Sequence, residues 1–267
     1  MRPFALLSDF GLADPYAGQL RAALARNAPG AQILDITHQV EPFAVDQAAF
    51  FLAASALHFP SNAVFVCVVD PGVGSTRRII GAHIETEAGG QDFLAPDNGL
   101  LGLLLFTPGL AAAQVYDLSL AAQQYEASAT FHGRDVFAPL AARLAHGESM
   151  SGLGLPMDRT DIERPAWADP SCGPCGVDVR VLHVDRYGNC LLSLRANFAP
   201  PKPPAWLRMP WGQRRGVLPV HTYADLGPGE IGLLAGSQGF LELAANQASA
   251  AEALGLRRGD AVRLLWN

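Results

Sequence analysis

The chain has 267 residues, of which 49% are hydrophobic and 16% are charged, a composition typical of a globular protein and not of a disordered one. Its formal net charge of −6 argues against a nucleic-acid partner, because phosphate binding requires clustered Lys and Arg side chains. No run approaches the roughly 18–20 uninterrupted apolar residues of a membrane span, so no membrane partner is expected.

The first half of the chain alternates strand and helix patterns. In chain order the pattern predicts a strand over 3–10, a helix over 14–29, a strand over 31–36, a helix over 44–59, a strand over 62–70, further apolar runs over 77–86 and 92–105, a strand over 112–118 and a helix over 133–147. The run over 62–70 is too continuously apolar to have a solvated face. This alternation predicts an α/β domain with a mostly parallel sheet and flanking helices on both faces.

The second half has a different pattern, which begins after a stretch rich in Pro, Asp and Gly. Short strands are predicted over 176–185, 189–194, 215–220, 229–235, 239–245 and 260–266, with one helix over 249–256. Short strands at close spacing predict a smaller β-domain resembling a barrel. We therefore expect an α/β domain over 1–165, a linker over 166–175 and a β-domain over 176–267.

The N-terminal apolar run meets Asp9 too early for a signal peptide, so the sequence favours a cytoplasmic protein. Cys67 and Cys190 lie in apolar runs and are expected to be buried free thiols. Cys172 and Cys175 form "CGPC", a spacing found in redox motifs and in half of a zinc site. No second pair follows and the surroundings are rich in Pro, which favours an incidental pair in the linker.

Several polar residues follow predicted strands, where open α/β sheets bind their ligands. Asp9 follows the first strand, Asp70 ends the strand over 62–70, Asp97 and Asn98 follow the run "FLAP", and His132 precedes the last helix of this half. If these strands are neighbours, their polar residues converge on one edge of the sheet. Each residue also has a structural alternative as a turn or cap residue.

The stretch "VVDPGVGSTRR" over 68–78 lacks the spacing of a phosphate-binding loop, and Asp70 would repel a phosphate at its mouth. It is better suited to holding Asp70 against Arg77, where both groups stay charged and hydrogen-bonded. Such a pair can orient a water molecule and accept a cationic substrate. The alternative is a solvated Arg77–Arg78 pair. His38 is interpreted as a packed residue at a strand end, and no metal-binding motif surrounds His132.

Six motifs, taken together and in order, resemble the S-adenosylmethionine hydroxide adenosyltransferases, relatives of fluorinase and chlorinase enzymes. The motifs are "SDFG" (8–11), "VVDPGVGSTRR" (68–78), "APDNGLL" (95–101), "FHGRD" (131–135), "DRYGN" (185–189) and "GSQGFLELAANQASAAEALGLRRGD" (236–260). The resemblance covers essentially the whole chain.

The resemblance implies that L-methionine is displaced from C5′ of S-adenosylmethionine by a water-derived nucleophile, which yields adenosine. It implies a homotrimer in which the N-terminal domain of one subunit and the β-domain of its neighbour enclose this small-molecule substrate, with no cofactor and no metal. The catalytic residues would be Asp70, Arg77 and His132, and Asp9 would hold the ribose hydroxyls. Further substrate contacts would come from Asp185, Asn189, Ser237, Glu242 and the backbone at Ala245.

Departures from the halogenating relatives favour hydroxide over halide. Gly133 stands where those enzymes carry a halide-binding Ser, His132 stands at a Tyr position, and Asp70 would repel an anion. Gln238 replaces an Arg that grasps the methionine carboxylate in some relatives. A non-catalytic nucleoside-binding trimer and a halide-dependent adenosyl synthase stay as alternatives. Whether His132 acts as a base or Arg77 polarises the water is open at this point.

Overall fold

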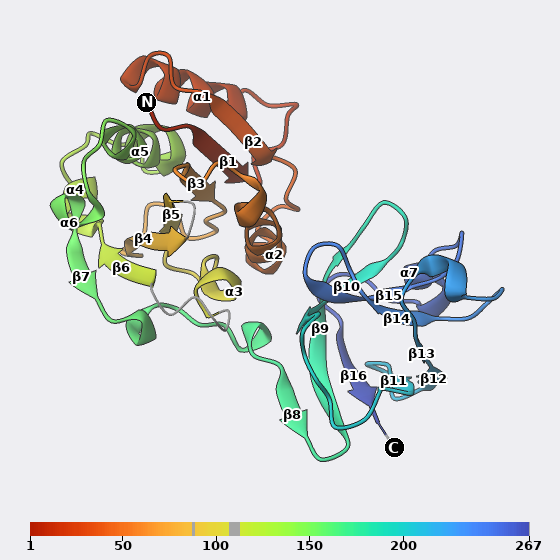
Figure 1. Cartoon of the computed structure of the whole chain (residues 1–267). Coiled ribbons are helices and arrows are strands. Elements are labelled where there is room, and N and C mark those ends of the chain that lie inside the picture. Colours follow the sequence, from red (N-terminus) through yellow and green to blue (C-terminus); the bar gives the residue numbers. More distant parts are fainter. Residues whose placement is uncertain (87–88, 107–112, 267) are drawn as a thin grey trace. The chain divides into compact units, whose positions relative to one another are not determined.

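A computed structural model describes residues 1–86, 89–106 and 113–266. The chain forms two compact units, Met1–Pro165 and Ala166–Asn267. The first unit combines a sheet with helices and the second consists mainly of strands, as Figure 1 shows. The α/β class with a smaller barrel-like β-domain is therefore confirmed. None of the described helices is long and apolar enough to cross a membrane.

The elements of the first unit begin and end as follows: β1 (Phe4–Ser8), α1 (Tyr16–Asn27), β2 (Ile33–Thr37), α2 (Val45–Ser55), η1 (Ala56–His58), β3 (Val64–Val68), β4 (Ile79–Thr86), β5 (Gly89–Pro96), α3 (Gly102–Leu105), β6 (Ala113–Asp117), α4 (Ser119–Ala122), η2 (Gly133–Phe137), α5 (Ala138–Ala145), α6 (Met150–Leu153), β7 (Leu155–Met157) and η3 (Arg159–Asp161). Residue 112, the first of the strand predicted over 112–118, lies outside the described residues.

The sheet of the first unit has the order β2-β1-β3-β5-β4-β6-β7. The pairs from β2 to β5 are parallel, whereas β5–β4, β4–β6 and β6–β7 are antiparallel. The sheet is thus mixed, and the parallel part predicted from the sequence is its first half. Chain length explains the change at β4, because only residues 87–88 separate it from β5 and a parallel crossover needs a dozen or more residues.

Helices cover both faces of this sheet, as Figure 1 shows, with α1 and α5 on one face and α2 and α3 on the other. Every residue of β1 and of β3 is buried, which agrees with the unbroken apolar pattern of 62–70. Phe4 and Leu6 of β1 pack in one core cluster with Leu20 of α1 and Leu140 of α5. Burial of each such side chain contributes roughly 1.5–3 kcal/mol to folding, so the packing of helices on the sheet stabilises the strands whose ends carry the polar residues.

The topology brings the ends of four strands to one edge. Because β2, β1, β3 and β5 are parallel neighbours, the residues that follow them, including Asp9, His38, Asp70 and Asp97, emerge at the same edge. β4 runs in the opposite direction with Ile79 opposite Pro96, so the residues before it start from that edge as well. The convergence of polar groups expected from the sequence is therefore confirmed for the loops that carry Asp9, Asp70 and Asp97.

The elements of the second unit are η4 (Ala166–Ala168), β8 (Ser171–Gly173), β9 (Gly176–Val184), β10 (Cys190–Arg195), β11 (Trp206–Arg208), β12 (Arg214–Gly216), β13 (Leu218–Pro219), η5 (Tyr223–Asp225), β14 (Gly232–Ala235), β15 (Phe240–Ala244), α7 (Ala250–Leu254) and β16 (Ala261–Leu265). The strand order is β12-β11-β16-β9-β10-β15-β14-β13, with β8 paired to β9.

The sheet of the second unit nearly closes into a barrel. Its two outermost strands, β12 and β13, are separated in the chain by Val217 alone. Val217 donates its N–H to the Ala205 carbonyl on one side, and Leu218 donates to the Ile231 carbonyl on the other. One extended segment thus joins both ends of the sheet, and Val217 itself is buried in the core.

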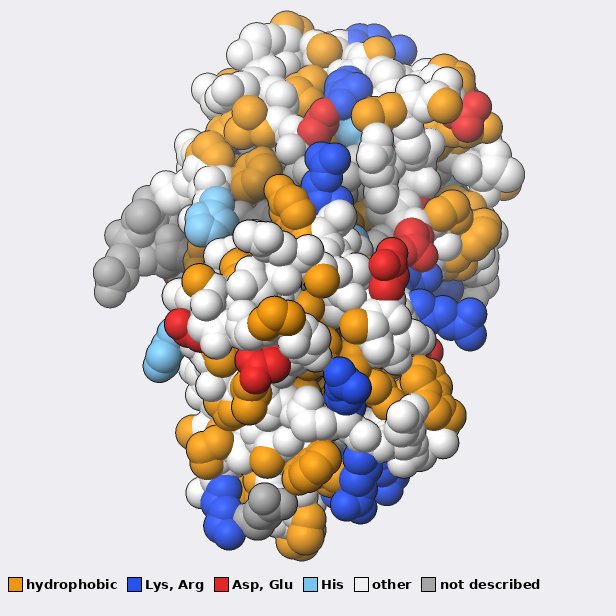
Figure 2. All heavy atoms as spheres, turned by 90° about the vertical axis from the view of Figure 1, so that its right-hand side faces the viewer, with side chains coloured by type: hydrophobic (Ala, Val, Ile, Leu, Met, Phe, Trp, Pro, Cys, Tyr) orange, Lys and Arg blue, Asp and Glu red, His pale blue; other side chains and the backbone are white. Residues whose placement is uncertain are grey.

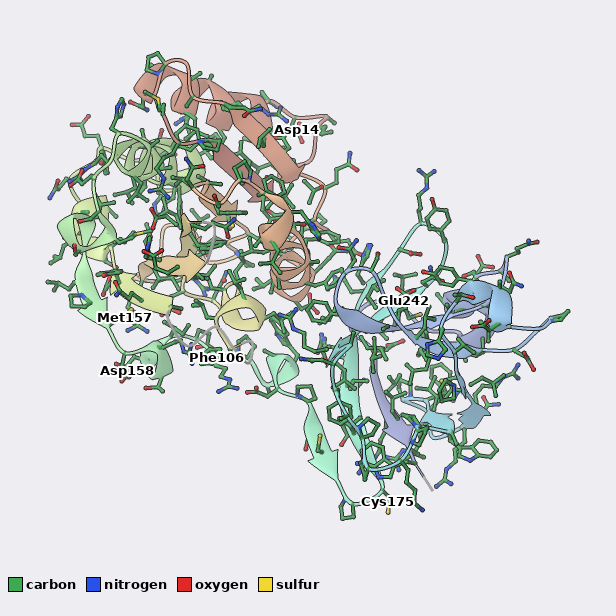
Figure 3. The ribbon with its side chains drawn as sticks, viewed as in Figure 1. Asp14, Phe106, Met157, Asp158, Cys175 and Glu242 are labelled. Carbon is green, nitrogen blue, oxygen red and sulfur yellow. The ribbon has the colours of Figure 1, made fainter. Side chains whose placement is uncertain are left out.

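The segment 166–175, predicted as a linker, carries η4 and β8. Cys172 of β8 pairs with Val177, and Cys175 lies at the turn between β8 and β9, as Figure 3 shows. Both thiols are free and exposed, while Cys67 and Cys190 are buried as expected. Within the described residues, no group of three or more His, Cys, Asp and Glu side chains could hold a metal ion.

Candidate active site

The loop after β3 places Asp70 and Arg77 against each other. Asp70 Oδ1 lies 3.1 Å from Arg77 Nε and also accepts the Gly72 N–H at 3.0 Å. The Asp70 side chain is 9% exposed and that of Arg77 is 31% exposed, so the pair sits at the surface boundary. A Cβ at Gly72 would overlap the Arg77 guanidinium, which explains the glycine in this loop. The contact expected from the sequence is therefore present.

The neighbouring arginine has a carboxylate of its own. Arg78 donates from Nε at 2.9 Å and from Nη2 at 2.6 Å to Asp97 Oδ2, and Asp97 Oδ1 accepts the Glu163 N–H at 2.8 Å. Arg77 Nη1 also approaches the Asp97 carbonyl, at 3.5 Å. The alternative of a solvated Arg77–Arg78 pair is thus wrong. Arg78 therefore binds Asp97 in the loop after β5, whereas Arg77 forms the ion pair with Asp70.

Asn98 has a structural role. Its Nδ2 donates to the Val69 carbonyl at 2.8 Å, and its Oδ1 accepts the Leu100 N–H at 3.2 Å. The side chain therefore ties the loop after β5 to Val69, which directly follows β3 and directly precedes Asp70. This contact supports the loop geometry.

His132 directly precedes η2, a short π-helical turn of the kind often found at functional positions. The aromatic ring of the preceding residue, Phe131, packs edge-on against Phe10 and Tyr16, with 5.5 Å between ring centroids in each case. On the other side, a Cβ at Gly133 would lie 3.2 Å from the Phe10 ring. These contacts hold the "FHGRD" segment against the "SDFG" segment.

The loop that carries Asp70 and Arg77 packs on the segment before His132. Gly74 has φ +81°, and a Cβ there would overlap the Ala129 carbonyl oxygen, so two backbones meet at this point. The structure thus joins the loops that carry Asp9, Asp70 and His132. In the described part of the chain, no direct hydrogen bond links those three side chains.

Asp9 is held by a residue that the motifs did not indicate. Its Oδ2 accepts the Phe43 N–H at 3.0 Å. Phe43 is 72% exposed and has φ +68°, a backbone conformation that is uncommon for a residue other than glycine. Because 34 residues separate the two in the chain, no local pattern could have revealed the contact. A carboxylate has further lone pairs, so Asp9 can still accept hydroxyl donors.

In the second unit, Asp185 and Asn189 organise the turn between β9 and β10. Asp185 Oδ1 accepts the N–H groups of Tyr187 at 2.8 Å and Asn189 at 2.9 Å, and its Oδ2 accepts Asn189 Nδ2 at 3.0 Å. Asn189 is buried. Gly188 has φ +84°, and its carbonyl accepts the Ala251 N–H at 2.9 Å, which joins the turn to α7.

Glu242 of β15, labelled in Figure 3, is a buried carboxyl group that binds a residue the sequence did not indicate. The Tyr223 hydroxyl donates to Glu242 Oε1 at 2.5 Å. Burial raises the pKa of Glu242, the charge of Asp185 adds to this, and the Tyr223 hydrogen bond opposes it. The same hydrogen bond, together with burial, raises the pKa of Tyr223 to about 12. Asp185, Tyr223 and Glu242 therefore lie close enough to influence one another.

The remaining candidates flank β15. Ser237 is exposed in the turn before the strand, next to the exposed Gln238, and Ala245 follows the strand and bridges to Ala248. The sequence candidates thus fall into two groups, one in each unit. The first group surrounds an Asp–Arg ion pair, and the second surrounds the buried carboxyl group of Glu242 and the buried amide group of Asn189.

Comparison with protein families matches both units. Residues 4–154 match the SAM hydroxide adenosyltransferase N-terminal domain, and residues 179–263 match the SAM hydroxide adenosyltransferase C-terminal domain. The first match lies within Met1–Pro165 and the second within Ala166–Asn267.

Individual relatives agree with these matches. An (R)-S-adenosyl-L-methionine hydrolase of Thermus thermophilus is 39% identical over 99% of this chain and 100% of its own length, and one of Salinispora tropica is 36% identical over 96% and 95%. A fluorinase of Nocardia brasiliensis is 27% identical over 97% and 95%. The crystal structure of an uncharacterized conserved protein from Thermotoga maritima superposes with a TM-score of 0.82 at 31% identity, covering 98% of this chain and 100% of that one.

Proposed function

The chain belongs to the SAM hydroxide adenosyltransferase family, and on that premise we propose that it hydrolyses S-adenosyl-L-methionine to adenosine and L-methionine. The observation that carries the proposal is the Asp70–Arg77 ion pair at the carboxyl edge of the sheet, beside the loop that carries His132. The identity of 39% with an enzyme named as a hydrolase supports the same reaction.

The chemistry requires little more than placement of the nucleophile. The sulfonium leaves as a neutral thioether, so the leaving group needs no general acid. In the proposed step an oxygen derived from water forms a bond to C5′, the C5′–S bond breaks with its electron pair going to sulfur, and one proton is released. Orienting the two reactants can lower a barrier by roughly 7–11 kcal/mol.

We assign the orientation of that water to Asp70, Arg77 and His132. Asp70 Oδ1 is held by Arg77 and by the Gly72 N–H, which leaves Oδ2 to accept a hydrogen bond from the water. A carboxylate at this position also suits a cationic sulfonium and disfavours halide. Water activation by a His132 base and water polarisation by Arg77 are separated by the pH dependence of kcat. A His132 base would make kcat of wild type fall at acidic pH, and this fall would disappear when His132 is replaced.

The substrate proposed is the (R) form, after the names of the relatives. Because the carbon stereocentres are already fixed in that name, (R) refers to the sulfonium sulfur. Separated sulfonium epimers test this: the (R) epimer should be consumed and the (S) epimer should persist. Consumption of the (S) epimer alone would contradict the assignment.

Assembly is proposed as a homotrimer with sites between subunits, because the candidate residues divide between two units. Asp9, Asp70, Arg77 and His132 belong to one unit, whereas the candidates from Asp185 to Ala245 belong to the other. On the face drawn in Figure 2, hydrophobic side chains lie at the surface among acidic and basic ones. Large exposed hydrophobic residues include Phe43 and Leu57 in the first unit and Tyr187 and Trp211 in the second.

Subunit complementation tests this arrangement. Asp70→Ala and Asn189→Ala should each abolish hydrolysis in separate homotrimers. If sites are shared, mixed trimers formed by co-expression regain part of the activity, because some sites combine an intact first unit with an intact second unit. Mixed trimers without activity, or a monomeric mass in light scattering, would contradict shared sites.

The reaction itself is tested by chromatography of S-adenosylmethionine incubated with the protein, with and without a large excess of chloride. Adenosine and methionine are expected from wild type, unaffected by chloride, and absent with Asp70→Ala. A chlorinated nucleoside would establish the halide-dependent synthase instead. Bound adenosine without turnover would establish the nucleoside-binding trimer.

A further inference from the structure

A row of hydrogen-bonded polar side chains begins at Ser8, the residue before Asp9, and its first two members are buried. His38 Nδ1 is 2.7 Å from Ser8 Oγ, and His38 Nε2 is 3.1 Å from Asp35 Oδ1. Ser8 is 0% exposed and His38 is 2% exposed. Asp35 of β2 is bound in turn by Arg21 of α1 through two nitrogens. The row therefore runs from a surface arginine to the last residue of β1.

The contacts define the direction of the hydrogen bonds. The Asp35 carboxylate can only accept, so His38 Nε2 carries a proton and donates to it. Burial, opposed by Asp35, lowers the pKa of His38, which favours the neutral ring. In that ring Nδ1 is an acceptor, so the Ser8 hydroxyl donates to it. Ser8 Oγ then accepts the Phe10 N–H, at 3.4 Å.

Ser, His and Asp in a hydrogen-bonded row also occur in hydrolytic triads, but this row cannot act as one. A nucleophilic serine must reach its substrate, and Ser8 has no exposed surface. The ring is also reversed, because a triad serine bonds Nε2 and its Asp bonds Nδ1. The row therefore has a different role.

The backbone of His38 and of Val40 makes two further hydrogen bonds, to Gly11 and Ser8 on either side of Asp9. The His38 carbonyl accepts the Gly11 N–H at 2.7 Å, and the nearby Val40 N–H donates to the Ser8 carbonyl at 3.4 Å. Ser8 and Gly11 enclose Asp9, so His38 holds the loop on both sides of that residue. Buried polar pairs rarely improve stability over apolar residues of the same shape, which indicates that this pair maintains a particular geometry.

We propose that His38 is a positioning residue, which acts through Ser8 and Gly11 to hold the Asp9 carboxylate where it receives the ribose hydroxyls of the substrate. The inference rests on the proposed function, in which Asp9 binds the ribose. Nothing in the motifs marks His38 for this role, because Ser8, its partner on β1, lies 30 residues away in the chain.

Ser8→Ala is the sharpest test, because it removes one buried oxygen and leaves the volume of the site nearly unchanged. The variant leaves His38 Nδ1 without its donor, and a buried acceptor that loses its partner costs about 1–3 kcal/mol, equivalent to roughly 5–150-fold in an equilibrium constant. We expect KM for S-adenosylmethionine to rise about 10-fold while kcat changes less than about 2-fold. Ser193→Ala is the matched control, since Ser193 is also buried and accepts the Arg180 N–H at 2.9 Å in the second unit.

Ligand binding separates positioning from general destabilisation and from failure of the proposed reaction. Calorimetry is run with adenosine and with 2′,3′-dideoxyadenosine, which lacks the ribose hydroxyls and needs no turnover. Wild type and Ser193→Ala should prefer adenosine, and Ser8→Ala should lose most of that preference. An unchanged preference in Ser8→Ala overturns the proposal, as does a wild type without preference for the hydroxyls.

Variants of His38 provide a second readout. His38→Asn keeps an acceptor near the position of Nδ1 and should retain more of the adenosine preference than His38→Leu. If His38→Leu fails to fold, the Ser8→Ala result decides alone. Absence of hydrolysis in wild type, with the adenosine preference still dependent on Ser8, would refute the reaction but support the positioning role.

Discussion

The carboxyl groups of Asp70 and Glu242 show how differently the two units use the same chemical group. Both are largely buried, with Asp70 in the first unit and Glu242 in the second. Asp70 lies beside the Arg77 guanidinium, whereas Glu242 lies beside the Tyr223 hydroxyl and within the influence of a second carboxylate, Asp185. Opposite charge suits the first group to a reaction involving a cation, and burial suits the second to recognition by hydrogen bonds.

The largest expected effect concerns the charge pair. Arg77→Lys should lower kcat by roughly 100-fold, because an ammonium cannot reproduce the geometry of the guanidinium beside Asp70. Arg78→Lys is the matched control, since Arg78 is its chain neighbour and pairs with Asp97. It should change kcat less than about 3-fold while lowering the melting temperature. Steady-state kinetics of both variants provide the measurement. An equal loss of kcat in the two variants would show that Arg77 and Arg78 do not have different roles.

The next effect concerns the contact between the loop that carries Asp70 and the segment before His132. Gly74→Ala should lower kcat about 10-fold and the unfolding free energy by about 1–3 kcal/mol, because its Cβ meets the Ala129 carbonyl and forces two loops apart. Gly30→Ala has a similar φ, +84°, but open space around the new Cβ, so it should affect stability alone. Kinetics and urea unfolding measure both. Unchanged kcat in Gly74→Ala would show that the loop contact does not set the site.

A smaller effect is expected in the second unit. Tyr223→Phe removes the hydrogen bond to Glu242 and should lower the unfolding free energy by about 1 kcal/mol. Tyr187→Phe, at a residue 74% exposed, should cost less than about 0.5 kcal/mol. Urea titration at neutral pH distinguishes them. Equal costs would mean that the Glu242 hydrogen bond contributes nothing to the fold.

The smallest effect is a change with pH. A carboxyl whose pKa is higher in the folded chain holds its proton more tightly there, so wild type loses unfolding free energy as pH rises above 4.5, the ordinary value for Glu242. Glu242→Gln removes this titration. The unfolding free energy of the variant relative to wild type should therefore be more favourable at about pH 7 than at about pH 4. The opposite trend would assign Glu242 to an environment that favours its charge.

Some features of the fold and the site follow from short stretches of sequence. The apolar run over 62–70 predicts a strand buried on both faces, and β3 is buried along its whole length. Asp70 and Arg77 are seven residues apart in one tight loop, so their contact is local and Gly72 leaves room for it. The six motifs, read together, led to the family that the domain comparisons match.

Other features depend on packing between distant segments. The closure of the barrel through Val217 and the contacts of Asp9 with Phe43 and of Glu242 with Tyr223 leave no local pattern. The sequence by itself determined which side chains are available and which strands have no solvated face, because sterics and hydrophobic periodicity act over a few residues. The partners of those side chains were decided only in the tertiary structure, because strand order and core packing bring together residues that the chain keeps far apart.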